Sequence, residues 1–147
     1  MVFVFSVLFG AFIGIFFLWF SSKNAVKDYP ELRIHVPEGA ENSPEWQAWA
    51  QENGYKLNDK GVWAKGTGML TSATEIRFEG NDMLVHMLVQ ECINFLLGIN
   101  RFAINAPILA GKPVRMVKIK ALNKLMAQWN LPEIVFGNPE DKVRIKN

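Results

Sequence analysis

The sequence predicts an α+β protein in which a single N-terminal transmembrane helix precedes a small domain with an antiparallel β-meander and two helices. Three observations predict this fold class. The first 20 residues carry no charge, whereas all 16 Lys and Arg and all 14 Asp and Glu come after them. Apolar and polar residues alternate within residues 55–89, as is typical of strands. Apolar residues then recur at helical spacing within residues 114–130.

The uncharged segment Val2–Phe20 is the predicted membrane span. Its length as a helix is roughly 28 Å, close to the thickness of a bilayer core. It lacks a basic region before it and a small-residue cleavage site after it, so we expect an uncleaved signal anchor. Lys23, Lys27 and Arg33 follow it, and the positive-inside rule then places the domain in the cytoplasm and the N-terminus outside. The opposite orientation is the alternative.

Three small residues within this segment, Ser6, Gly10 and Gly14, are spaced four apart. They therefore lie on one helix face, where two backbones can approach closely. This predicts helix association, and the alternative is that glycine is simply common in membrane helices. The expected partners are the lipid bilayer and, through this face, a second copy or another membrane protein.

The chain divides into four predicted parts: a transmembrane anchor (1–22), a juxtamembrane linker (23–42), a soluble α+β domain (43–137) and a flexible charged tail (138–147). The linker contains one short extended piece at residues 32–36. Ser43 suits an N-cap and Pro44 the first helical position, which predicts a helix that ends at Asn53. Trp46 and Trp49 share one face of it. We expect them in the core, with contact to a membrane interface as the alternative.

Strands are predicted next in the chain. Residues 55–57 and 62–64 flank the turn-forming sequence at residues 58–61, which predicts a hairpin. Residues 74–79 alternate between apolar and charged, and residues 83–89 should return antiparallel to them. Pro132 then marks the end of the predicted helix at residues 114–130.

The stretch Met83–Ile99 is apolar enough to compete as a second membrane helix. Glu91 alone would cost about 3 kcal/mol at the centre of a bilayer, and three further polar side chains would also enter lipid. A buried strand that passes into a second strand or a short helix is therefore the prediction.

No catalytic, metal-binding or cofactor-binding residue is predicted. Cys92 is the single cysteine, so it forms no internal disulfide and no cysteine-rich zinc site. His35 and His86 belong to no spacing typical of a metal site. Gly61–Gly68 superficially resembles a phosphate-binding loop, but Thr67 stands where the lysine should be. The net charge of +2 argues against a nucleic-acid partner.

One group of basic residues stands out in the last predicted helix. Five of them fall within thirteen residues that include no acid, namely Lys112, Arg115, Lys118, Lys120 and Lys124. Such a face can contact anionic lipid or a partner. A solvated helix face is the alternative.

These observations favour a non-catalytic binding or scaffold protein that presents a small domain at the membrane surface. A meander closed by a C-terminal helix with a buried tryptophan is similar to pleckstrin-homology-like architecture, which makes a lipid-headgroup-binding module one alternative. A small membrane-bound enzyme with an unrecognised site is the other. A deep pocket that contains His86, Cys92 or paired carboxylates would favour the enzyme.

Overall fold

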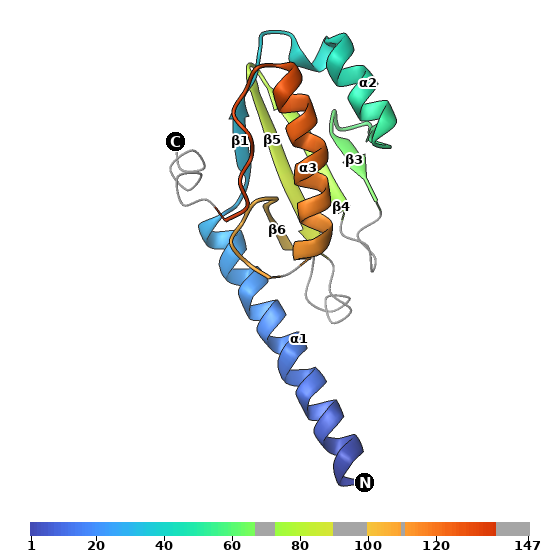
Figure 1. Ribbon diagram of the computed structural model, residues 1–147, viewed down its shortest axis with the longest axis vertical. Helices are drawn as coiled ribbons and strands as arrows, with labels where there is room; N and C mark the ends of the chain where they lie inside the picture. Colours follow the sequence, from blue (N-terminus) through green and yellow to red (C-terminus); the bar gives the residue numbers. More distant parts are fainter. Residues whose placement is uncertain (67–72, 90–99, 110, 138–147) are drawn as a thin grey trace.

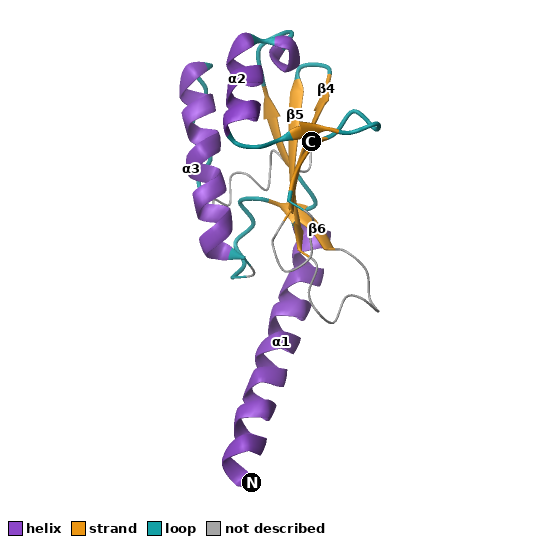
Figure 2. Ribbon diagram, turned by 90° about the vertical axis from the view of Figure 1, so that its right-hand side faces the viewer, coloured by secondary structure: helices purple, strands orange, loops and turns teal. Residues whose placement is uncertain are grey.

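The structure is a computed structural model of the chain, and it describes residues 1–66, 73–89, 100–109 and 111–137. The helices are α1 (Val2–Asp28), the 3-10 helix η1 (Ala40–Asn42), α2 (Pro44–Glu52) and α3 (Lys112–Gln128). The strands are β1 (Leu32–His35), β2 (Lys56–Leu57), β3 (Trp63–Lys65), β4 (Ala73–Glu79), β5 (Asp82–Val89) and β6 (Asn100–Ala103). Helices α2 and α3 cover one face of the sheet, and α1 extends away from it (Figures 1 and 2).

The six strands form one antiparallel sheet with the order β1-β5-β4-β3-β2. Strand β6 also pairs with β5, beyond the end of β1: β1 pairs with residues 82–85 of β5, and β6 pairs with residues 86–89. The predicted α+β class with an antiparallel meander is confirmed. The hairpin at residues 58–62 forms where turn residues were recognised in the sequence, and residues 80–81 join β4 to β5.

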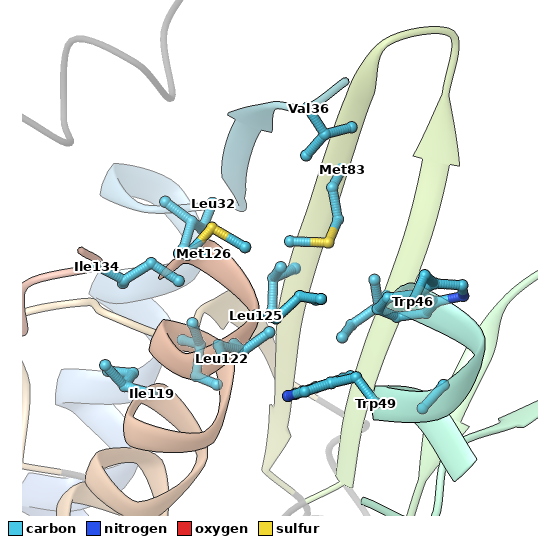
Figure 3. Close-up of a cluster of buried hydrophobic side chains, with 14 of the residues drawn as sticks. Leu32, Val36, Trp46, Trp49, Met83, Ile119, Leu122, Leu125, Met126 and Ile134 are labelled. Atoms are coloured by element: carbon cyan, nitrogen blue, oxygen red, sulfur yellow. The ribbon is translucent and has the colours of Figure 1, made fainter. Parts of the chain in front are cut away.

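The alternation in β4 and β5 creates the main core. Ile76, Met83 and Val85 are fully buried and face the helices. Leu122 and Leu125 of α3 belong to the same buried cluster, and the close-up in Figure 3 shows them together with Met83. The apolar stripe predicted for the last helix is therefore confirmed as its sheet-facing side.

Helix α2 is fastened to this core by its two tryptophans. The Ser43 hydroxyl accepts a hydrogen bond from the Trp46 amide at 3.2 Å, which confirms the predicted N-cap. Trp46 is fully buried and meets the Phe78 ring edge-on, with 4.9 Å between ring centroids. The Trp49 indole donates to the Ala121 carbonyl at 2.8 Å and so links α2 to α3. The core placement of both tryptophans is confirmed.

Helix α1 has two parts with different surroundings. Its first part is exposed, for example at Phe3, Phe9 and Phe17. Its last turns reach the sheet, where Ala25 is buried in a small apolar cluster with Phe102. Residues 23–28, which the sequence assigns to the linker, are helical and belong to these last turns.

The predicted transmembrane helix is wrong, and with it the signal anchor and the single-pass membrane localisation with a cytoplasmic domain. Over the ranges that the structure describes, no helix is both long enough and apolar enough to cross a bilayer. The sequence argument treated Val2–Phe20 as an element complete in itself. In the structure it is the first part of a longer helix whose final turns pack on the sheet.

Strand β5 covers the first part of Met83–Ile99, the stretch that competed as a second membrane helix. Residues 83–89 are strand, as predicted, and run through the middle of the sheet between β4 and the β1/β6 edge. Cys92 and Glu91 lie outside the described residues. Strand β6 was not located in the sequence.

Candidate functional site

The chain reverses direction after α3 and returns along it. Asn130 adopts a positive φ of 54°, and the Leu131 amide donates to the Met126 carbonyl at 2.8 Å. The returning segment ends where the Gly137 amide donates to the Asn105 carbonyl, also at 2.8 Å. Figure 1 shows this dark red segment beside α3.

A side-chain amide holds the returning segment at a fixed distance from α3. Asn123 donates to the Ile134 carbonyl at 3.1 Å and accepts from the Ile134 amide at 2.7 Å. The Ile134 side chain is itself buried in the core. Because both backbone groups of Ile134 are bonded to one side chain, the segment keeps a defined position beside α3. We call its residues 133–136 the wall.

A groove of about 1030 Å³ runs between α3 and this wall. Its apolar lining includes Met116, Ile119, Val135 and Phe136. Met116 is 46% exposed and Val135 is 52% exposed, so apolar surface faces solvent on both sides of the groove. Exposed apolar surface that has ordered walls is typical of an interaction site.

The side chain of Arg115, one of the five basic residues singled out in the sequence, is buried on the inner side of α3. Its guanidinium donates to the carbonyls of three residues that follow β6: Ile104, Ala106 and Ile108. It also lies 5.4 Å from the Phe102 ring centroid and 4.8 Å from that of Phe136. Burial lowers the Arg115 pKa to about 10, so the group remains charged at neutral pH. Arg115 therefore holds the fold together rather than presenting its charge outside.

Lys118 also turns toward the sheet. Its ammonium donates to the hydroxyl of Thr74, which is fully buried in β4. Burial lowers the Lys118 pKa to about 8, and the nearby charge of Lys65 acts in the same direction. Burial also raises the pKa of the neighbouring Tyr55 to about 12, although a hydrogen bond with Thr74 acts in the opposite direction. This end of the interface between helix and sheet is polar but sheltered.

The other three basic residues, Lys112, Lys120 and Lys124, are exposed and line the groove. The Lys112 ammonium lies 5.2 Å from the centroid of the Phe136 ring, across the groove. The structure thus divides the predicted basic face into two buried or half-buried cations and three exposed ones. Only the exposed three are placed to meet another molecule.

The small-residue face of α1 is open in the structure. A Cβ atom added at Gly10 or Gly14 would meet no atom within 4 Å. The Ser6 hydroxyl donates to the Val2 carbonyl one turn earlier, at 2.9 Å. Association through this face stays a prediction.

The sheet face opposite the helices carries a network of ion pairs. Arg33 lies 3.1 Å from Glu31 and 3.0 Å from Asp82. His86 lies 3.2 Å from Glu31, and His35 lies 3.1 Å from Asp82. Burial lowers the His86 pKa although Glu31 opposes it, and bonds from His35 and then Arg33 lower the Asp82 pKa. The charges of this face largely satisfy one another.

The remaining candidates from the sequence have simple placements. Residues 61–66 form a turn and strand β3 of a hairpin, which is not the geometry of a phosphate-binding loop; Thr67 and Gly68 lie outside the described residues. In the described part of the chain, no three His, Cys, Asp or Glu residues are grouped so as to hold a metal ion.

Sequence reasoning missed the wall of the groove. The short apolar piece of residues 134–136, two residues after Pro132, was the available signal, since apolar residues that follow the end of a helix tend to pack on the fold. The role of Asn123 had no such signal, because its bonds reach eleven residues along the chain.

Comparisons with protein families, with curated proteins and with solved structures found no match for this chain.

Proposed function

We propose that this protein is a non-catalytic binding module, and that the groove between α3 and residues 133–136 receives a segment of a partner protein. The observation that carries this proposal is the exposed apolar lining of the groove. Met116 and Val135 face solvent from opposite walls, and the Asn123 bonds to Ile134 keep those walls apart. A preformed groove of this kind loses little entropy when a segment binds.

The histidine that would have favoured an enzyme does not lie in this groove. His86 belongs to the opposite face of the sheet and is engaged with Glu31. Burial lowers its pKa, although the charge of Glu31 acts in the opposite direction. The groove itself is lined by apolar side chains, lysines, Asn123 and one glutamate, Glu133. Such a lining supports binding better than acid–base chemistry, which needs paired titratable groups.

A displayed library of peptides of random sequence, selected against the full-length chain, tests the proposal. The selected peptides are then titrated against the double variant Met116→Asp/Val135→Asp, in which both exposed groove walls become charged. The matched control is Leu57→Asp, since Leu57 is an exposed apolar residue (54%) on strand β2, away from the groove.

We expect the double variant to weaken peptide binding at least tenfold and the control to leave it unchanged. Peptides that bind all three proteins equally, or a selection that enriches none, would overturn the proposed function. Both outcomes are interpretable because all three substituted side chains are exposed, so the fold should tolerate the changes.

A further inference from the structure

The charges around the groove are unequal. Three lysines, Lys112, Lys120 and Lys124, and one acid, Glu133, line it, which gives a net charge of +2. None of the ion pairs between described residues involves Lys120 or Lys124; those pairs lie on the opposite face of the sheet and its edge. The groove therefore presents positive charge that its own fold does not neutralise with a salt bridge among these residues.

The lysines follow a regular line along α3. Lys112, Met116, Lys120 and Lys124 are spaced four apart, and residues at this spacing lie along the same side of a helix. Each step of four residues rises roughly 6 Å, and the lined part of α3, residues 112–127, extends over roughly 22 Å. This is the length of a helix of about four turns.

The groove lining is apolar as well as basic. Its apolar floor consists of Ile119 and Ile134, which are almost fully buried, and of Met116 and Val135, which are about half exposed. A partner helix that lays an apolar stripe on this floor would bring its flanking side chains to Lys120 and Lys124. Carboxylates at i and i+4 of that helix would repeat with the same rise of roughly 6 Å.

We infer that the segment received by the groove is an amphipathic helix of a partner protein, with acidic residues flanking its apolar stripe. This inference rests on the proposed function and names the chemistry of its partner. A lipid surface fits less well: Arg115 and Lys118 turn inward, and the exposed lysines border an elongated hollow rather than a flat basic face. Charge complementarity along the groove gives the selectivity.

The test uses the peptides selected from the library and the charge-reversal variant Lys120→Glu/Lys124→Glu. The matched control is Lys56→Glu/Lys60→Glu, which reverses two exposed lysines of the β2–β3 hairpin. We expect the selected peptides to carry Asp or Glu spaced by four beside their apolar positions. Groove reversal should weaken their binding at least tenfold, whereas hairpin reversal should not. Peptides in which each Asp or Glu is replaced by Lys should recover binding to the groove-reversed protein.

The outcomes separate the two proposals. Selected peptides that are neutral or basic, and that lose binding to Met116→Asp/Val135→Asp, would overturn the acidic partner and leave the proposed function in place. A selection that yields no groove-dependent peptide would overturn both. Vesicles of phosphatidylserine and phosphatidylcholine form the last arm. Binding to them that Lys120→Glu/Lys124→Glu abolishes, without any selected peptide, would assign the lysines to lipid and also overturn the inference.

Discussion

Basic residues on the two sides of helix α3 have opposite surroundings, since those on one side are sheltered and those on the other are exposed. Arg115 and Lys118 turn inward, where backbone carbonyls after β6 and the Thr74 hydroxyl of β4 accept their hydrogen bonds. Lys120 and Lys124 face the groove and solvent. All four come from one basic run in the sequence. The difference teaches that charge alone does not predict a binding surface, since a long cationic side chain also serves to bond internal backbone groups.

The largest effect should come from Arg115, on the sheet side. Arg115→Ala removes a buried cation and leaves the carbonyls of Ile104 and Ala106 without it, so we expect the free energy of unfolding to fall by about 3 kcal/mol. Urea unfolding followed by tryptophan fluorescence measures this. Arg101→Ala is the control, since the Arg101 side chain is 59% exposed, and its effect should stay within about 0.5 kcal/mol. Equal effects of the two substitutions would erase the distinction between the two kinds of cation.

Substitution of Lys118 should have the next largest effect on the free energy of unfolding, and this effect should depend on pH. Its pKa is about 8 in the folded chain and near 10.5 when unfolded, so the unfolded chain binds more protons between these values. Stability contributed by this group is therefore lowest below pH 8 and rises between pH 8 and 10.5. We expect Lys118→Met to be more stable than the wild type by about 1 kcal/mol at pH 7, after allowance for partial exposure.

Urea unfolding at pH 7 and at pH 9.5 measures the Lys118 effect. The advantage of Lys118→Met should shrink at the higher pH, because the wild-type lysine then loses its charge in the folded state. An advantage that is the same at both pH values would show that the sheltered charge is not the cause.

Substitution of Asn123 tests the groove side of α3. Asn123→Ala removes both bonds to Ile134 and should lower the free energy of unfolding by about 1 kcal/mol. Hydrogen exchange at the Ile134 amide should become faster. In Asn123→Asp the acceptor oxygen remains, so protection of that amide should be kept; loss of protection in both variants would contradict the role of the side-chain acceptor.

The smallest effect on stability should come from the exposed lysines. Lys120→Ala and Lys124→Ala remove side chains that form no ion pair with a described residue. The free energy of unfolding should therefore change by less than about 0.5 kcal/mol. The same urea experiment measures it. A loss above about 1 kcal/mol would mean that these lysines support the fold, as Arg115 does.

The elements whose signals are local were predicted well. Ser43 and Pro44 marked the start of α2, and the alternation in residues 74–79 marked β4 and its buried face. These patterns depend on the backbone period and on neighbouring residues, which the sequence displays directly. The membrane span was the exception. An apolar run was visible, but the helix that contains it continues into the packed part of the fold.

The sequence by itself determined that the protein is α+β, where most strands and helices begin and end, and that α3 carries five basic residues. Only the tertiary structure decided which of these are buried and which are exposed along the groove, because that depends on contacts distant in the chain: Arg115 with Ile104, Lys118 with Thr74, and Asn123 with Ile134. Helical spacing sets the side of a helix on which a residue lies. What packs against that side, and hence where a groove remains open, is set by the fold as a whole.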